Sequence, residues 1–183
     1  MIRNMYRLMN TIDCIATKLD IREFSKENVP SNLISIILDS ARYSGSGLNT
    51  QHWRFIVIKE KNNLKKLSED STSGQWIVEA NFAIILLTDP KYAFHLLDAG
   101  RVIQNMQLSA WDNGIGSGIY TGMRDEKMRN DFKIPLNLSI SAVVGFGFPK
   151  KPITGKRKNR KPLNELTYNE VFGNSENVNL INN

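Results

Sequence analysis

The chain has 183 residues, 41% of them apolar, which is enough for one sizeable buried core and predicts a single domain over residues 1–183. It has no run of about 18 apolar residues and no apolar signal-peptide core at its start, so we expect neither a membrane span nor a membrane partner. The formal net charge of +6 makes nucleic-acid binding one class of function to consider. Seven cations between Lys150 and Lys161 account for that charge and leave the remainder near neutral (6 − 7 = −1), so no nucleic-acid partner is predicted.

The first part of the chain predicts two helices separated by an extended segment. Apolar residues at helical spacing indicate a helix over about residues 3–17 and another over residues 31–41, with Ser31 as the N-cap of the second. Cys14 lies within the first pattern, where a core or surface position on the helix is favoured over a reactive thiol. As the sole cysteine it excludes an internal disulfide and fits a reducing cytoplasm, the expected location of the protein.

The rest of the chain alternates apolar runs with helical patterns and predicts four or so strands. Periodicity alone does not decide between an α+β and an α/β arrangement. The predicted strands cover residues 54–59, 82–87 and 139–146, with one more leading out of 114–120, and the predicted helices cover 61–69, 92–113 and 126–132.

The longest predicted helix carries a coiled-coil-like seam. Its apolar residues fall at alternating spacings of three and four. A helix this apolar in a small domain is either central to the core or part of a dimer interface. The seam consists of Leu96, Ala99, Ile103, Met106 and Ala110.

The loop within residues 42–55 has the composition of a ligand-binding loop. Two glycines, short hydroxyl residues, an Asn and a Gln lie between a helix and an apolar strand. Glycines let backbone amides approach a ligand closely, and short polar side chains can hydrogen-bond to it. Held between two rigid elements, such a loop suits recognition of a flat polar ring edge.

This loop resembles the nitroreductase family of FMN-dependent oxidoreductases, in which a helix ends in the pattern Pro-Ser-x-x-Asn-x-Gln-Pro-Trp-x-Phe. Gly45 and His52 replace the two prolines. The matching residues are Ser46, Asn49, Gln51, Trp53 and Phe55. The resemblance assigns flavin contacts in this loop to Gly45, Ser46, Gly47 and Asn49.

Residues 18–24 resemble the family's Arg-Arg-Ser-Ile-Arg-x-Phe, whose basic residues and serine surround the FMN phosphate, ribityl chain and pyrimidine edge. Lys18 and Arg22 keep cations at the first and last basic places, while Leu19 and Asp20 depart from the pattern. All four are candidate cofactor residues. We expect Asp20 to weaken flavin binding without abolishing it, because it brings a carboxylate near a dianionic phosphate. An ordinary surface salt-bridge cluster is the alternative interpretation.

Residues 114–122 resemble the family's Gly-Leu-Gly-Ser-x-Trp-Ile-Gly, whose amides approach flavin N5. By register, the residues nearest N5 would be Ile119, Tyr120 and Thr121. Glycines after a long helix also serve simply as a C-cap and turn, which is the alternative here. Gln75 stands where short family members often carry Gly-Gln and is assigned a further flavin contact.

Lys158 and Arg160, just before Pro162, resemble the family's late phosphate clamp. A guanidinium and an ammonium suit phosphate oxygens by bidentate and point-charge contact, respectively. The alternatives are a solvated basic tail and a nucleic-acid patch. No aromatic residue interrupts the basic run, which argues against stacking on single strands.

The resemblance covers about residues 12–172 and implies an α+β, nitroreductase-like fold: helices around a four- to five-stranded mixed, mostly antiparallel sheet in a domain-swapped homodimer. Residues 163–183 would pack on the partner subunit. The implied reaction is ping-pong transfer of hydride from NADH or NADPH through FMN N5 to a small electron acceptor, such as a nitroaromatic, quinone or activated alkene. No side chain is assigned a catalytic role, because the flavin carries the chemistry.

Two alternatives to this function remain. A reductive dehalogenase-like flavin enzyme would need a lid insertion, and no long insertion lies between residues 70 and 100. The second alternative is a non-enzymatic basic protein that has lost the flavin. It would account for the departures from the family pattern at Asp20, Gly45 and His52. No His, Cys, Asp and Glu cluster has metal-ligand spacing, so no metal is predicted.

Overall fold

The computed structural model describes residues 10–152 and 159–174. Its helices are α1 (Thr11–Thr17), α2 (Ser31–Arg42), α3 (Lys61–Glu69), α4 (His95–Asp112) and α5 (Asp125–Phe132), and its strands are β1 (Arg54–Ile58), β2 (Phe82–Thr88), β3 (Gly116–Tyr120) and β4 (Ser139–Gly147). Short 3-10 turns cover Gly47–Asn49, Gln75–Glu79 and Leu163–Glu165. The order of these elements agrees with the order predicted from the sequence.

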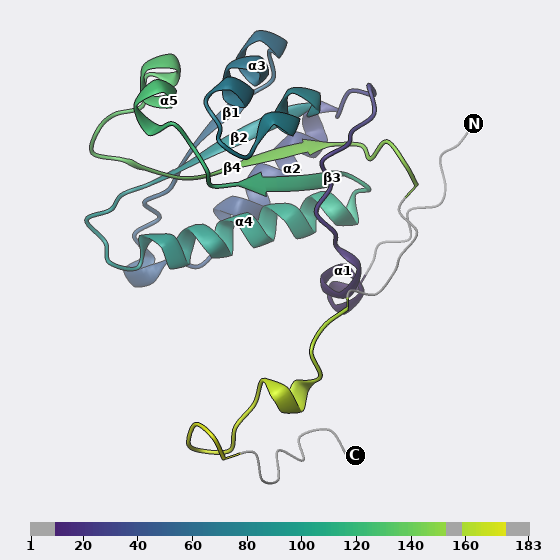
Figure 1. Cartoon of the computed structure of the whole chain (residues 1–183), viewed down its shortest axis with the longest axis vertical. Coiled ribbons are helices and arrows are strands. Elements are labelled where there is room, and N and C mark those ends of the chain that lie inside the picture. Colours follow the sequence, from purple (N-terminus) through teal and green to yellow (C-terminus); the bar gives the residue numbers. More distant parts are fainter. Residues whose placement is uncertain (1–9, 153–158, 175–183) are drawn as a thin grey trace.

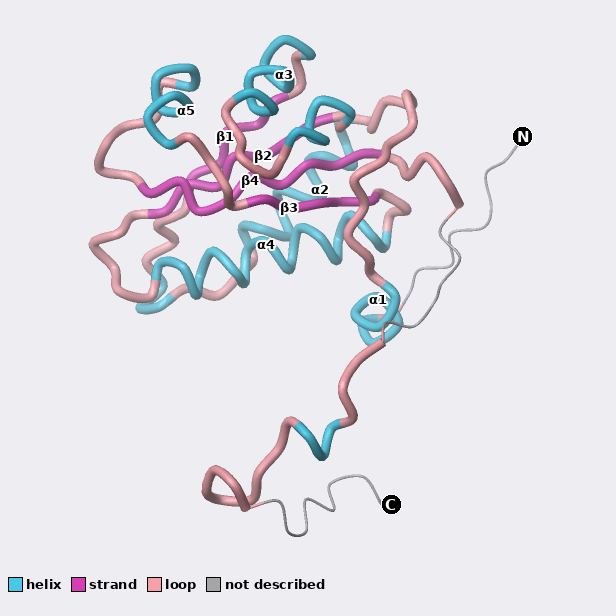
Figure 2. Tube along the Cα trace, viewed as in Figure 1, coloured by secondary structure: helices cyan, strands magenta, loops and turns pink. Residues whose placement is uncertain are grey.

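The four strands form one sheet in the order β1-β2-β4-β3 (Figure 2). Every neighbouring pair is antiparallel. Val143 of β4 marks the register, since it lies opposite Ile85 of β2 on one side and Tyr120 of β3 on the other. A parallel bridge between Asp20 and Ser117 adds the chain's extended N-terminal segment to the β3 edge. This bridge is the parallel component of the sheet in the described residues.

Helices cover both faces of the sheet (Figure 1). On one face α2 and α4 pack through Ile37 and Met106, and on the other face α3 and α5 pack through Leu67 and Met128. Because β2 runs between these two clusters, all seven of its residues are buried. A strand buried on both faces reads as a continuous apolar run, which is why its position was predictable from the sequence.

The N-cap of α2 and the start of α4 differ from the prediction. Pro30, with its fixed φ, occupies the N-cap of α2, so the prediction of Ser31 as the N-cap was wrong. α4 begins at His95 because the aromatic rings of Tyr92 and Phe94 pack near His52 in a turn. For the first predicted helix, residues 3–9 lie outside the described residues.

The seam of α4 divides between core and surface. Ala99 and Met106 are buried in the core, and Ile103 packs against it. Leu96 and its neighbour Leu97 are 60% and 62% exposed. The helix is therefore central along one stripe and leaves a second apolar patch uncovered at its N-terminal end.

Residues 159–174 form an arm that leaves the body beside α1 (Figures 1 and 2). Its apolar side chains are exposed, and the rings of Tyr168 and Phe172 contact each other with centroids 4.4 Å apart. Packing of 163–183 on a partner subunit stays a prediction. Residues 175–183 lie outside the described part of the chain.

Candidate cofactor site

The extended segment 18–24 lies along the β3 edge. The amide of Ile21 donates to the carbonyl of Ser117 at 2.8 Å. Glycines make this approach possible: a Cβ on Gly116 would lie 2.8 Å from the Ile21 Cβ, and one on Gly118 would lie 2.7 Å from the Ile21 carbonyl oxygen. The glycines of β3 therefore have a structural role in seating this segment.

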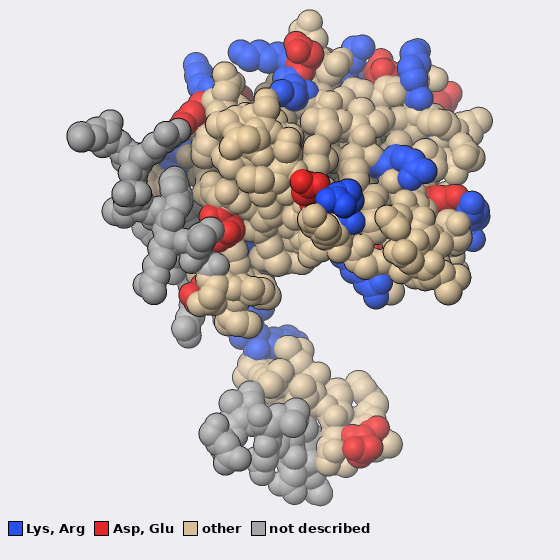
Figure 3. All heavy atoms as spheres, turned by 180° about the vertical axis from the view of Figure 1, so that it is seen from behind, with Lys and Arg blue, Asp and Glu red and all other residues tan. Residues whose placement is uncertain are grey.

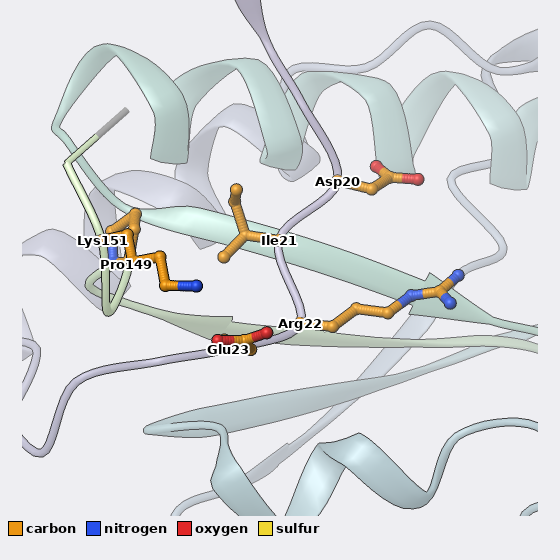
Figure 4. A pocket seen from close by; sticks show the side chains of 6 residues that line it. All are labelled: Asp20, Ile21, Arg22, Glu23, Pro149 and Lys151. Atoms are coloured by element: carbon orange, nitrogen blue, oxygen red, sulfur yellow. The ribbon is translucent and has the colours of Figure 1, made fainter. Parts of the chain in front are cut away.

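Side chains alternate along the segment, as they do in any extended chain. The side chains of Asp20 and Arg22 point to one side and those of Ile21 and Glu23 to the other (Figure 4). All four residues line a cavity of about 420 Å³, together with Pro149 and Lys151. One side of this strand-like segment therefore presents a carboxylate and a guanidinium, and the other side presents an apolar side chain and a carboxylate.

Lys18 is buried, with a relative exposure of 7%, and its ammonium lies 2.5 Å from Asp20 Oδ1. The Asp20 side chain is 48% exposed. The predicted proximity of Asp20 to the cations assigned to the phosphate thus takes the form of an ion pair with Lys18. An ammonium has three N–H donors, so Lys18 keeps donor capacity beyond this contact.

A cavity of about 480 Å³ joins two stretches of sequence that were predicted separately. It is lined by Lys18, Leu19, Asp20, Asn159 and Arg160. The cavity combines two cations with one carboxylate, which leaves one net positive charge for an oxyanion. Lys158, the other predicted clamp residue, lies outside the described residues.

The loop with the second group of candidates, Gly45 to Asn49, is strained. Leu48, Asn49 and Gln51 all have positive φ, at 52°, 53° and 46°. Few non-glycine residues adopt this region, and three within four positions require strong support from their surroundings. The Ser46 hydroxyl supplies part of that support by accepting the Gln51 amide at 3.0 Å.

The two groups of candidates lie at opposite ends of α4. The Gly47 amide donates to Asp98 in the first turn of that helix, whereas Trp111 in the last turn donates its indole N–H to Thr17, next to Lys18. At 1.5 Å per residue, the thirteen-residue step between the two anchoring positions on α4 spans about 20 Å. Within one chain, therefore, the loop and the Lys18 cavity do not meet.

The candidates near β3 are placed differently from one another. Tyr120 is buried, and its hydroxyl donates to the Leu67 carbonyl at 3.2 Å. Burial removes the phenol from water and raises the Tyr120 pKa well above its usual value. Ile119 packs towards the core shared by α2 and α4, while Thr121 is exposed. Gln75 is exposed, and its amide nitrogen lies 3.4 Å from the Ser71 carbonyl. None of the four lines the Lys18 cavity.

Trp76 is a candidate that the sequence interpretation missed. Gly118 and Gly145 face each other across β3 and β4, and a Cβ on either would lie 2.8 Å from the Trp76 ring. The Arg22 guanidinium lies 5.8 Å from the ring centroid, and the buried indole nitrogen has no hydrogen-bond partner among the described residues. Paired glycines on neighbouring strands were the available signal.

The charges on the face seen in Figure 3 are dispersed, with several Lys and Arg side chains lying beside Asp or Glu. Within residues 10–152 and 159–174, no cluster of three or more His, Cys, Asp or Glu is placed to hold a metal ion. Among the described helices, none has the length and apolar character needed to cross a membrane.

Comparison with known proteins gives matches over most of the chain. The model of the nitroreductase family matches residues 15–87 and 72–148. A protein of Archaeoglobus fulgidus, provisionally named as an NADH dehydrogenase/NAD(P)H nitroreductase, is 36% identical over 147 residues, which are 74% of this chain and 83% of that protein.

One solved structure and one more distant relative add to this comparison. The crystal structure of a provisionally named nitroreductase from Desulfovibrio desulfuricans in complex with FMN has a TM-score of 0.78 and 25% identity, covering 90% of this chain and 99% of that one. An iodotyrosine deiodinase of Hydra vulgaris is 25% identical over 183 residues, covering 80% of this chain and 67% of the deiodinase.

Proposed function

Because the chain belongs to the nitroreductase family, we propose that it is an FMN-dependent oxidoreductase that passes electrons from NADH or NADPH to a small acceptor. The observation that carries this proposal is the cavity in which Lys18 and Arg160 come together. These two residues were assigned to the FMN phosphate from separate motifs. Their convergence is what a phosphate site built from both ends of the chain requires.

The chemistry of the cavity fits the phosphate end of FMN. A guanidinium has five N–H donors and an ammonium has three, and both groups form charge-assisted hydrogen bonds with phosphate oxygens. Asp20 reduces the net charge, but its half-exposed carboxylate can turn towards water when an anion enters. The site would therefore hold the phosphate with less net attraction than two free cations would give.

The remaining flavin contacts would come from a second copy of the chain. In an isologous dimer whose α4 helices pack antiparallel, the N-terminal end of one helix lies against the C-terminal end of the other. That arrangement would bring Ser46 and Asn49 of one chain to the Lys18 cavity of its partner. The exposed Leu96 and Leu97, beside a 640 Å³ hollow that Gly45 also lines, provide the apolar surface.

The side chains of this site would bind and orient rather than transfer protons. Lys18 and Arg160 would hold the phosphate of FMN, and the bound flavin would supply the hydride-transfer chemistry between the nicotinamide nucleotide and the acceptor. Tyr120 is held as a neutral phenol bonded to Leu67, and His52 is bonded to the buried Asp98. Rate would come from holding the reactants in contact at the flavin face, for which positioning is sufficient.

Reductive dehalogenation is the second candidate function, because a deiodinase is among the relatives. The connection between β2 and α4 spans only residues 89–94, which provides no lid over a halogenated substrate. We therefore rank nitroaromatic, quinone and activated-alkene reduction ahead of it.

The decisive experiment is FMN titration of the purified protein, followed by NADH and NADPH oxidation against an acceptor panel that includes a halotyrosine. We expect FMN binding and nucleotide-dependent reduction of a nitroaromatic or a quinone. Halotyrosine reduction alone would favour the second function. A protein that does not bind FMN would overturn both.

A further inference from the structure

Asp98 is a fully buried carboxylate outside the residues assigned to the flavin. Its relative exposure is 0%, although it is an aspartate in the first turn of a helix, α4. A buried carboxylate is costly unless donors satisfy it. The source of those donors therefore reveals what the residue holds in place.

Both bonds to Asp98 Oδ2 come from the strained loop or from its end. The Gly47 amide donates at 3.0 Å, and His52 Nε2 lies 3.2 Å away. His52 Nδ1 accepts the Asp89 amide at 3.4 Å, which places the ring proton on Nε2 and makes His52 a donor to Asp98. On the other oxygen, Oδ1, Arg101 donates at 3.1 Å from the helix itself.

These contacts bracket the residues with positive φ. Gly47 precedes Leu48 and Asn49, and His52 follows Gln51, so Asp98 fixes the loop immediately before and after its strained part. Phe94 closes the same side, since a Cβ on Gly47 would lie 2.6 Å from its ring. Strained backbone persists only where its surroundings determine it, and here one carboxylate does so at both ends.

We propose that Asp98 is a positioning residue that, through Gly47 and His52, holds the 46–51 loop in its flavin-binding conformation. The inference rests on the proposed function for the identity of the ligand. It also explains the chain's departure from the family pattern at residue 52: histidine supplies a side-chain donor to Asp98 that proline lacks.

Two substitutions of similar size separate the hydrogen bonds from simple packing. Asp98→Asn can keep a carbonyl oxygen at the Oδ2 position and so retain both loop contacts, while Arg101, whose side chain is 49% exposed, can turn to water. Asp98→Leu removes every acceptor. Leu64→Ala, on the opposite face of the sheet, is the control for general destabilisation.

The readouts are amide hydrogen exchange of residues 47–51 in the flavin-free protein and the Kd for FMN. For Asp98→Leu we expect at least tenfold faster exchange of the Gly47 amide and at least a tenfold higher Kd. Asp98→Asn should stay within about threefold of wild type in both readouts. Leu64→Ala should lower the melting temperature without selective exchange in the loop.

Equal losses in Asp98→Asn and Asp98→Leu, or unchanged loop exchange in Asp98→Leu, would overturn the proposal. If Asp98→Leu fails to fold, His52→Leu and His52→Gln provide the same contrast, since glutamine keeps a donor. A wild type without FMN affinity would overturn the proposed function instead, while loop exchange in the flavin-free variants would still decide the role of Asp98.

Discussion

Two carboxylates, Asp20 and Asp98, are associated with opposite ends of α4 and are held in different ways. Asp20 is about half exposed and pairs with the ammonium of Lys18 at 2.5 Å. Asp98 is fully buried and accepts from a backbone amide, a histidine and an arginine. Asp20 lies in the cavity assigned to the FMN phosphate, and Asp98 lies behind the loop assigned to the flavin ring.

This difference in burial determines what each carboxylate can do. The Asp20 carboxylate is open to water, so water can replace its bond to Lys18 at small cost to the carboxylate. A buried carboxylate that loses its donors has no such replacement and costs several kcal/mol, on the order of 3–5. Asp20 can therefore give way to an incoming anion, whereas Asp98 belongs to the framework.

The largest effect we predict tests whether the two ends of α4 meet through a second chain. Leu97→Asp should give monomers that do not retain FMN, because it places an unpaired charge in the proposed interface. Leu97 is 62% exposed in the single chain, so the substitution spares the chain's own core. Ile103 is a poorer choice, since it packs against that core.

Sedimentation velocity and flavin content measure this outcome. Leu136→Asp is the matched control, because Leu136 is 89% exposed and lies in the connection between α5 and β4. It should behave as wild type. A wild type that sediments as a monomer with bound flavin would contradict the shared site.

The next largest effect is expected at Arg160. Arg160→Ala should raise the Kd for FMN by about tenfold to a hundredfold, because a charge-assisted contact to phosphate is worth roughly 1.5–3 kcal/mol. Arg160→Lys should recover part of the loss by keeping the charge. Lys150→Ala should change the Kd by less than twofold, since Lys150 does not line the cavity.

A nucleic-acid patch would give another pattern. Each basic residue would then contribute about equally to the affinity for a random duplex, and that affinity would fall steeply as the salt concentration rises. Titrating FMN and duplex at two salt concentrations separates the two cases. Equal losses of duplex affinity in Arg160→Ala and Lys150→Ala, without any loss of FMN affinity, would refute the clamp.

Elements with strong local signals were predictable from the sequence. Helix α3 matches its predicted range of residues 61–69, and β2 extends its predicted range by one residue. Both are bounded by turn residues and have an unambiguous apolar pattern. The start of α4 was not predictable in this way, because Tyr92 and Phe94 continue the apolar pattern but pack into a turn near His52.

The candidate site was predictable in part. Motif resemblance selected Lys18 and Arg160, and the structure places them around one cavity. It did not select Asp98, because an aspartate in the first turn of a helix ordinarily faces solvent and its burial depends on where the loop folds. Contacts between segments distant in sequence have no local signature.

A smaller effect of opposite sign is expected at Asp20. Asp20→Ser should lower the Kd for FMN by about threefold to tenfold, because it removes a like charge worth about 1 kcal/mol at 4 Å in water. Glu23→Ser is the matched control, since Glu23 points to the other side of the segment (Figure 4). An unchanged or higher Kd in Asp20→Ser would show that its carboxylate is directed away from the phosphate.

The smallest effect on the flavin is expected at Tyr120, which the family resemblance placed near N5. Tyr120→Phe should leave the Kd for FMN and the turnover number within twofold of wild type, because the hydroxyl donates to Leu67 inside the core. The same change should lower the free energy of unfolding by about 1–3 kcal/mol, since the Leu67 carbonyl loses a buried donor. Urea unfolding measures the free energy of unfolding, and FMN titration and steady-state kinetics measure the Kd and the turnover number.

Because burial raises the Tyr120 pKa far above neutrality, the phenol stays protonated in the native state. The stability difference between Tyr120→Phe and wild type should therefore be constant from pH 6 to 8. A large loss of turnover without a loss of stability would instead place the hydroxyl among the groups that act on the bound acceptor.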